Sequence, residues 1–505
     1  MGQLAPVYGT IVPSQQMQPL ITNYLAFDGG NNDFAQQFLP EVYEQEVERY
    51  GNRTLSGFLR MVGAEMPMTS DQVIWSEQNR LHVSYGTEAA NGSQVQMNAA
   101  GTTLAITQRT VAQGFVQNVI QPNSTIVVMN TVTGATLKCI IGIAPTTAGG
   151  VTTLTPLSYT TATMVSLRDV PAVAAVTTNI KLFVYGSEFA KGTVGSQNGI
   201  TPSFTQFSNS PIIIKDQYQI SGSDTAQIGW VEVATEDGTS GYLWYLKGES
   251  ETRLRFEDYL EMAMVEGELA VAGSGFVAGQ ANVPGFGASA GLGNSNGVAI
   301  AAKGTEGLFA AITARGNLMS GFNAGTGISD FDQILKNLDT QGAIEENMLF
   351  LNRSTDLGFD DMLGQISSGG AGGTAYGLFE NSEQMALNLG FSGFRRGSYD
   401  FYKTSWKYLN DASTRGAVAV SGIDGVLIPA GTSTVYDQML GTNIRRPFLH
   451  VRYRSSEADD RRYKSWITGS VGGAYTSSLD AMQVHFLSER CLVTQAANNF
   501  VLFQA

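Results

Sequence analysis

The residue types that carry most enzyme chemistry are sparse in this chain, and they do not stand in a recognised arrangement. The three histidines, His82, His450 and His485, lie far apart, and neither a His-Glu-x-x-His run nor a Cys-x-x-Cys pair is present. A catalytic nucleophile needs a base beside it, and an isolated histidine is more often structural or simply exposed. We therefore expect no catalytic residue and no metal site.

Motifs that bind phosphates or cofactors give no stronger signal. A Gly-x-x-x-x-Gly-Lys-[Ser/Thr] loop does not occur. Gly273, Gly275 and Gly279 imitate a dinucleotide fingerprint, but a predicted helix precedes them where the fingerprint requires a strand. The sequence thus predicts no cofactor and a protein that is not an enzyme.

One stretch near the C-terminus concentrates basic side chains. Glu457, Asp459 and Asp460 dilute its charge. Two interpretations are equally supported: a salt-bridged contact to an acidic neighbouring subunit or a weak phosphate contact, and a solvated loop whose charges cancel locally. The basic residues are Arg445, Arg446, Arg452, Arg454, Arg461, Arg462 and Lys464.

The stretch from Tyr242 to Ala270 predicts one long helix around which the rest of the chain is organised. At 1.5 Å per residue it would run about 40 Å, far beyond an average helix. Gly248 is unfavourable inside a helix, so two shorter helices meeting there are the alternative. One face of the second half is apolar, with Phe256, Tyr259, Leu260, Ala263 and Gly267.

The middle of this predicted helix is charged. Glu249 with Arg253, and Glu251 with Arg255, are spaced i, i+4 with the acid first, which is the favourable order. Apolar ends and a charged middle indicate a spanning helix that packs at two places. These four residues and the arginines of the basic stretch are our candidates for subunit contacts.

Bulk composition excludes several classes of protein. The 505 residues carry a net charge of −14 and only 15% charged side chains, so tight binding of nucleic acid through its phosphates is not expected. Two cysteines fit a reducing compartment. The N-terminus has neither a signal peptide nor the Ser or Thr that myristoylation needs at position 6, and no membrane-spanning run is present. We expect a soluble protein made in a cytoplasm.

The first half of the chain changes from helical to strand patterns. Residues 1–30 show no period and are expected to form an arm laid on a neighbour, and Asp33 to Tyr50 is predicted helical. Thr54 can cap a short helix. Short strands between Leu104 and Tyr185 predict a small antiparallel barrel or sandwich. The strands expected there and beyond are Thr125 to Met129, Thr136 to Ile143, Val151 to Leu157, Ile180 to Tyr185, Pro211 to Gln219 and Ile228 to Val233.

The second half mixes helices and strands. Ser329 can cap a helix with an apolar face at Phe331, Ile334, Leu335 and Leu338, and Thr355 can cap another with Phe359, Met362, Leu363 and Ile366. Strands are expected at Met348 to Asn352, at Ser398 to Trp406 and through most of residues 425–505. The overall fold class is therefore α+β.

The order of these parts resembles the major capsid proteins of tailed double-stranded DNA bacteriophages, which share the Hong Kong 97 fold. VIWSEQNRL (Val73 to Leu81), the segment from Leu182 to Gly222 and RFEDYLEMAMVEGELA (Arg255 to Ala270) are similar to stretches of one branch of that family. The likeness is greatest to the crAss-like gut phages and covers the whole chain as a pattern of parts.

The resemblance implies a subunit that self-assembles into hexamers and pentamers of an icosahedral head, assembled in the bacterial cytoplasm. Portal, scaffolding and decoration proteins, and packaged double-stranded DNA held without specific contacts, are the implied partners. Some members cross-link Lys to Asn; Lys138, Lys181 and Lys191 lie in the loop, but no partner is identified. The implied parts are an arm at 1–70, an extended loop at 71–236 with a barrel insertion at about 104–190, a peripheral domain at 237–340 with its spine helix at 242–270, an axial domain at 341–480, and a C-terminal strand at 481–505 that returns to the peripheral domain.

Two other interpretations stay open. A secreted or surface β-rich adhesin, or another assembly protein, fits the strand content but lacks a signal peptide. An enzyme with an unrecognised site on an α+β fold would need a substrate whose turnover depends on one buried carboxylate or histidine.

Overall fold

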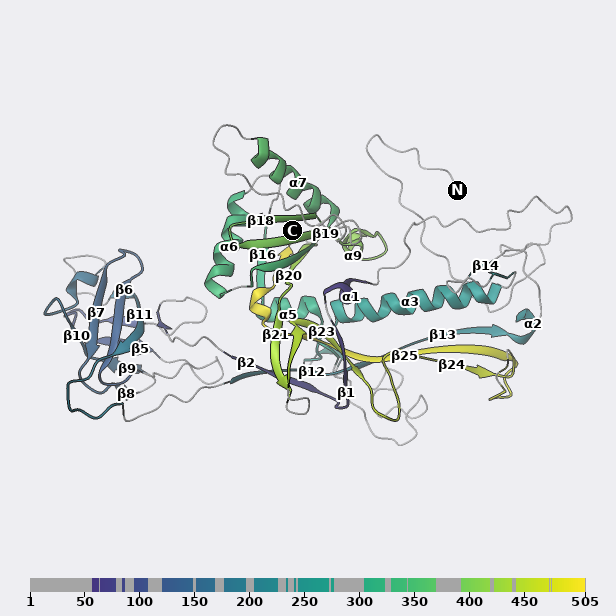
Figure 1. The fold of residues 1–505 in the computed structure, drawn as a ribbon, viewed down its shortest axis with the longest axis horizontal. Helices are drawn as coiled ribbons and strands as arrows, with labels where there is room; N and C mark the ends of the chain where they lie inside the picture. Colours follow the sequence, from purple (N-terminus) through teal and green to yellow (C-terminus); the bar gives the residue numbers. More distant parts are fainter. Residues whose placement is uncertain are drawn as a thin grey trace. The chain divides into compact units, whose positions relative to one another are not determined.

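The structure is a computed structural model in which the chain forms two compact units (Figure 1). Unit 1 comprises residues 1–75 and 207–505, and unit 2 comprises residues 76–206. The predicted arm and the predicted helix from Asp33 to Tyr50 lie largely outside the described residues. Those residues are 57–62, 64–78, 84–86, 95–107, 120–148, 151–168, 177–196, 204–225, 233–234, 240–241, 244–271, 274–276, 304–322, 328–342, 344–368, 392–417, 422–437, 442–471, 473 and 475–504.

The long helix of unit 1 is α3, Trp244–Glu266. It is shorter at both ends than the sequence predicted, but it continues through Gly248, so the alternative of two helices is wrong. A Cβ built on Gly248 would lie 2.5 Å from Cζ of Tyr218. The glycine therefore admits a strand side chain close to the helix backbone and does not mark a bend.

The apolar face of α3 is confirmed in part. Phe256 and Leu260 are buried, whereas Tyr259 is 43% exposed and does not belong to the core. The buried face rests on one end of a long sheet. Its partners there are Ile220, Met482, Val484 and Phe486.

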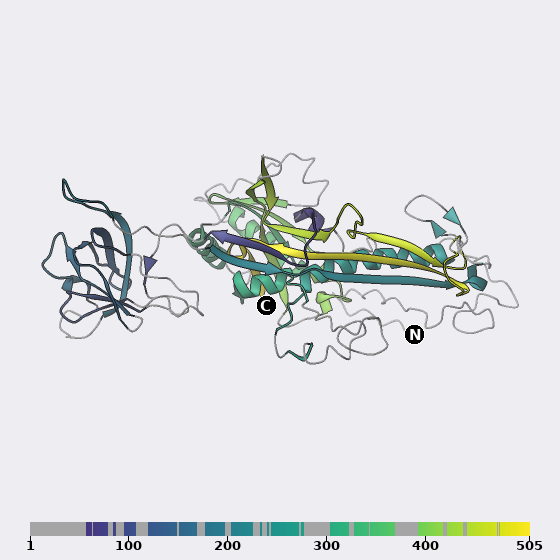
Figure 2. The ribbon, with the colours of Figure 1, turned by 90° about the horizontal axis from the view of Figure 1, so that it is seen from below.

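That sheet is organised around β25 (Ala481–Thr494), whose length is 14 residues. One edge of β25 pairs antiparallel with β13 (Ile212–Ser221). The other edge pairs first with β24 (Lys464–Gly469) and then with β23 (Leu449–Arg454), and β23 is joined in parallel by β1 (Glu65–Met68). Figure 2 shows β13 and β25 running side by side along α3.

A second, six-stranded mixed sheet carries α6 (Ile328–Gln341) and α7 (Arg353–Ser368) (Figure 1). The predicted face of α6 is confirmed, because Phe331, Ile334 and Leu338 are buried against the sheet. The strand order is β16 (Asn317–Ser320), β26 (Val501–Gln504), β20 (Ile423–Pro429), β17 (Glu346–Leu351), β19 (Tyr399–Ser405) and β18 (Ser392–Arg396).

Both predicted helix caps in this region are wrong. Ser329 is the second residue of α6, and Thr355 lies within the first turn of α7. The side chain of Asn352 caps α7, because its Oδ1 accepts a hydrogen bond of 2.7 Å from the backbone N–H of Thr355. Asn is itself a favoured N-cap residue type, and the prediction of Thr355 as the cap did not consider Asn352.

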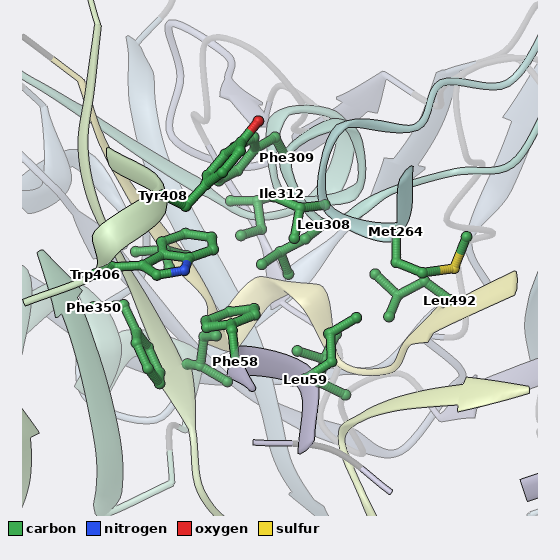
Figure 3. Packing of buried hydrophobic residues seen from close by; sticks show 14 of the residues in the cluster. Phe58, Leu59, Met264, Leu308, Phe309, Ile312, Phe350, Trp406, Tyr408 and Leu492 are labelled. Atoms are coloured by element: carbon green, nitrogen blue, oxygen red, sulfur yellow. The ribbon is translucent and has the colours of Figure 1, made fainter. Parts of the chain in front are cut away.

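A third apolar cluster joins the two sheets (Figure 3). It receives Phe58 and Leu59 from α1 (Phe58–Val62), Met264 from the end of α3, and Trp406 from the end of β19. Figure 3 shows these side chains converging with those of α5 (Leu308–Arg315) and with Leu492 of β25. The C-terminal region thus contributes to both sheets, β25 to the first and β26 to the second.

The described part of unit 2 is an antiparallel sheet in which β3 (Ser84–Tyr85) also pairs with β11. Side chains from strands far apart in the sheet share one core, among them Met97, Leu104, Ile126 and Leu182, so the sheet must curl around it. The order is β10 (Pro156–Ser158), β7 (Thr136–Ile141), β6 (Ser124–Asn130), β11 (Thr177–Ser187), β4 (Val95–Met97), β5 (Leu104–Thr107), β9 (Val151–Leu154) and β8 (Thr146–Ala148).

The chain passes between the units along two paired strands, β2 (Val73–Gln78) and β12 (Phe204–Asn209). The remaining elements are short. They are α2 (Gly222–Thr225), β14 (Val233–Ala234), β15 (Ser240–Gly241), α9 (Lys407–Asn410), β21 (Thr432–Asp437), β22 (Thr442–Pro447) and the 3-10 turns η2 (Val165–Leu167), η4 (Arg415–Ala417) and η5 (Ala497–Asn499).

Candidate functional site

The basic stretch predicted as a contact surface is largely neutralised inside the chain. The guanidinium of Arg454 lies 3.0 Å and that of Arg461 2.8 Å from the two carboxylate oxygens of Glu489 on β25. Glu65 of β1 is shared in the same way, 2.5 Å from Arg462 and 3.4 Å from Arg490. The carboxylate side chain of Glu489 is only 9% exposed.

These ion pairs favour local cancellation of charge over an open basic surface. The acids that cancel this charge, however, are mainly distant in sequence. Among the ion pairs of the described residues, Asp459 is the only nearby acid that binds a cation of the stretch, and it lies 2.8 Å from Lys464. The network therefore ties β1, β23 and the loop before β24 to β25. We call Glu65, Arg454, Arg461, Arg462 and Glu489 the arginine network.

The other predicted arginines fall into two groups. Arg452 donates a hydrogen bond of 3.2 Å to the backbone oxygen of Pro67 on β1. Arg445 and Arg446 lie on β22, opposite Thr434 and Ser433 of β21, and their side chains are outside the described set. The structure therefore places Arg454, Arg461 and Arg462 in ion pairs with acids of β25 and β1, and Arg452 on the backbone of β1.

On α3, the charged middle is engaged with neighbouring residues of the same unit. Arg255 forms an ion pair of 3.2 Å with Asp216 of β13, and Glu251 lies 3.9 Å from Lys247, one turn earlier. Glu249 and Arg253 lie one turn apart on the same helix. Because Arg255 reaches across to a strand, it helps fix α3 on the sheet.

A carboxylate that the sequence did not single out holds the N-terminal end of the described chain. Glu261 of α3 accepts hydrogen bonds from the backbone N–H groups of Gly57 and Leu59, at 2.6 and 2.7 Å. Burial raises the pKa of Glu261, although these amide hydrogen bonds act in the opposite direction. The contact fixes α1 onto α3.

The paired strands β2 and β12 are held by an arginine of α5. Arg315 lies over the ring of Phe207 at 4.5 Å and that of Trp75 at 5.7 Å, and it forms an ion pair of 2.7 Å with Glu306. Asn209, at the end of β12, is buried, and its side-chain amide donates to the backbone oxygens of Glu306 and Leu492. These residues fix the point where β12 returns to unit 1.

Lys403 is a buried cation in the six-stranded sheet. Its side chain is 4% exposed, and its Nζ lies 2.7 Å from a carboxylate oxygen of Asp356 and 2.7 Å from one of Asp360, both on α7. The two acids are one helical turn apart and so reach the same ammonium group. The triad binds α7 to β19.

The two histidines within the described residues are each engaged with neighbouring groups of the fold. His450 is buried with its Nδ1 3.1 Å from the backbone oxygen of Pro447, and the ring of His485 stacks on Trp466 with its Nε2 2.7 Å from Oγ1 of Thr468. His82 is outside the described residues. Within the described residues, no group of three or more His, Cys, Asp or Glu is placed to hold a metal ion.

Two further observations bear on function classes. Residues 287–291 (GASAG) and 293–297 (GNSNG) match the Gly-x-Ser-x-Gly pattern of some hydrolases. A stretch rich in Gly and Ser produces this pattern by composition alone, and both matches lie outside the described residues.

None of the helices in the described segments has the length and apolar character needed to span a membrane.

No protein-family model matches this sequence, and no curated protein is detectably related to it. Among solved structures, one from Microbacterium phage Oxtober96 matches with 9% identity and a TM-score of 0.36, covering 93% of this chain and 95% of its own. One from Mycobacterium phage Cain matches with 8% identity and a TM-score of 0.29, covering 62% and 77%. The asymmetric unit of bacteriophage PhiM1 mature capsid matches with 9% identity and a TM-score of 0.29, covering 63% and 79%. At these TM-scores the likenesses are too loose to define a common fold.

Proposed function

We propose that this chain is a structural subunit of a phage capsid, the major capsid protein of a tailed double-stranded DNA bacteriophage with the Hong Kong 97 fold. The observation that carries the proposal is the layer formed by α3 on β13, β25 and β24. A helix of 23 residues lies along strands of 10 and 14 residues. The apolar core between these two layers has only six buried residues in the part of the chain that the structure describes, so much of the element's surface is left for contacts with neighbouring subunits.

Exposed apolar side chains on this layer support an assembling subunit. Ile213 of β13 is 53% exposed, Trp466 and Ile467 of β24 are 38% and 45% exposed, and Tyr259 of α3 is 43% exposed. Large exposed apolar patches mark contact surfaces on soluble proteins, and these four side chains belong to the strands and helix of one two-layer element. The 15% content of charged residues fits a protein that gives much of its surface to partners.

The finer assignment keeps the parts that the resemblance to the capsid family implies. We assign the arm to 1–70, the extended loop to 71–236 with its insertion at about 104–190, the peripheral domain to 237–340, the axial domain to 341–480 and the returning strand to 481–505. The same proposal includes a relationship to crAss-like phages and assembly into hexameric and pentameric capsomers. It also includes portal, scaffolding and decoration proteins as partners, and assembly in the bacterial cytoplasm. The acidic balance would keep packed DNA from adhering to the shell.

The predicted contact residues divide within this proposal. Arg445 and Arg446, on the β21–β22 hairpin, and Glu249 of α3 remain candidates for contacts between subunits. The arginine network has partners within the chain, so its members would act by shaping the subunit that neighbours bind.

The test is the mass and form of the purified full-length protein. Light scattering together with negative-stain electron microscopy should find pentamers, hexamers, tubes or closed shells. A protein that stays monomeric even when it is co-expressed with its scaffolding protein contradicts the proposal and favours the adhesin alternative.

A further inference from the structure

The two units of this chain carry charge of opposite sign. Residues 76–206, which form unit 2, contain six Lys or Arg and four Asp or Glu, a net charge of +2. The whole chain contains 30 and 44, so the residues of unit 1 hold 24 and 40, a net charge of −16. Unit 2 is therefore a weakly basic body attached to a strongly acidic one.

The strands of unit 2 turn one set of side chains outward, away from its core. Cys139 and Ile141 of β7 are buried, so the alternation points Lys138 outward. The strand register places Lys138 opposite Val127 of β6, and Val127 opposite Phe183 of β11. Side chains from three neighbouring strands thus lie in one outward row.

This outward row continues onto β10 and the end of β11. Leu157 is 55% exposed, and Tyr159 and Tyr185 are each 49% exposed. The hydroxyl of Tyr159 donates a hydrogen bond of 2.5 Å to Glu188, so the carboxylate beside the row is already engaged. We define the outer face of unit 2 as Lys138, Leu157, Tyr159, Lys181, Phe183 and Tyr185.

The chemistry of the outer face is that of a protein contact. It joins aromatic and aliphatic side chains, the types enriched at interface centres, to the ammonium groups of Lys138 and Lys181. A surface of this kind fits a partner that is both acidic and partly apolar. Unit 1 has both properties, since it carries the excess of acids and exposes Ile213, Tyr259 and Ile467.

Charge also selects how two copies can meet. Two chains with a net charge of −14 each repel one another unless oppositely charged parts face across the contact. We propose that the outer face of unit 2 binds the acidic unit 1 of a second copy of this chain. The proposal rests on the proposed function, because it names one of the contacts by which the subunits would assemble.

The experiment compares particle formation by variants of the full-length protein. Leu157→Glu places a carboxylate on β10, the edge strand of the outer face, and Lys138→Glu reverses an exposed charge on the neighbouring strand without touching the core. Thr146→Glu is the matched control, because it adds the same charge to an exposed residue of β8, at the other end of the sheet order. We expect at least about tenfold fewer particles from each outer-face variant and a wild-type yield from the control.

The folding of unit 2 is checked in the same samples by the buried thiol of Cys139, which stays unreactive while its core is intact. Wild-type yields from both outer-face variants would overturn the inference and leave the proposed function standing. Normal particles that fail to retain a different virion protein would also overturn it, because the occupant would not be a second copy. Failure of the wild-type protein to assemble with its scaffold would instead remove the proposed function.

Discussion

The ring of Phe58 stacks on the indole of Trp406, with centroids 4.2 Å apart and ring planes inclined by 16°. Phe58 also meets the edge of Phe350 at 4.6 Å. Trp406 and Phe350 belong to the six-stranded sheet region, whereas Phe58 comes from α1, which Glu261 fixes to α3. One side chain from the start of the described chain thus joins the two sheets of unit 1.

Replacing Phe58 by Ala should destabilise unit 1 by about 3–5 kcal/mol, because it removes a fully buried ring and leaves a cavity between the sheets. Denaturant unfolding of the dissociated subunit measures this loss. Leu357→Ala, at a side chain that is 54% exposed, is the control and should change the unfolding free energy by less than about 0.5 kcal/mol. Equal effects of the two changes would contradict the joining role of Phe58.

Glu489 holds two arginines of the arginine network, so Glu489→Gln should leave Arg461 without its anion and Arg454 with only the exposed carboxylate of Asp71. We expect a loss of about 2–3 kcal/mol, below the range for fully buried pairs because Arg454 and Arg461 keep 28% and 29% of their side-chain exposure. Unfolding in urea measures the change.

The control for Glu489 is Glu457→Gln, at an exposed acid of the same stretch. If charges cancelled mainly between sequence neighbours, this control would cost as much as the change at Glu489. A loss confined to Glu489 shows that β25 supplies the cancelling charge.

Glu266, at the end of α3, should make unit 1 sensitive to acid. Burial opposes its ionisation, but hydrogen bonds from Arg415 and from the Tyr408 hydroxyl outweigh burial and lower the pKa of Glu266. A carboxylate with a lowered pKa stabilises the fold above its unfolded pKa of about 4.3, and this contribution is lost as the pH falls through the folded value. Wild type should therefore exceed Glu266→Gln in stability above about pH 5, and the difference should shrink below about pH 4.

The measurement for Glu266 is the unfolding free energy of both proteins across that pH range. A difference that grows on acidification would contradict the sign of the pKa shift. Tyr408→Phe provides a control, since it removes one hydrogen bond to Glu266 but keeps the ion pair with Arg415.

The elements with a strong period could be predicted from the sequence. The apolar spacing of Phe331, Ile334 and Leu338 fixes the buried face of α6, and alternation gives β6, β7 and β11 within a few residues of their observed ends. Alternation and helical spacing are local properties, and packing then preserves them. The prediction that Tyr259 is buried was wrong, because this residue lies at the edge of the face of α3 that the sheet covers.

The contacts that position the candidate site could not be predicted in this way. Glu261 lies 204 residues from Gly57, and Asn209 lies 283 residues from Leu492. Nothing local marks an acid or an amide for a backbone partner so distant, because the partner is set by how the sheets stack. Gly248 shows the same limit. A glycine is needed there because the ring of Tyr218, on another element, lies against the helix backbone.

The two cysteines should report the unfolding of the two units separately. Cys139 lies in the core of unit 2 and Cys491 on β25 of unit 1, and both are free and buried. Burial raises the pKa of the Cys139 thiol to about 11 and that of Cys491 to about 12, so thiolate is scarce at pH 8. Neither thiol should react with a disulfide reagent in the native protein, and both should react once their unit unfolds.

Single Cys→Ser variants assign each reaction to its unit. Labelling during a denaturant titration then gives one midpoint for Cys139 and one for Cys491. Rapid labelling of either thiol without denaturant would contradict the burial of that core.

Deleting residues 1–30 should abolish shells while leaving a folded, soluble subunit. The deletion spares the contacts by which Glu261 holds Gly57 and Leu59, and Phe58 stays on Trp406, so the unfolding free energy should match that of the full chain. Replacing the same 30 residues by a scrambled segment of equal composition separates the need for length from the need for sequence. Electron microscopy and light scattering measure the outcome, and normal shells from the deleted protein would show that the predicted arm takes no part in assembly.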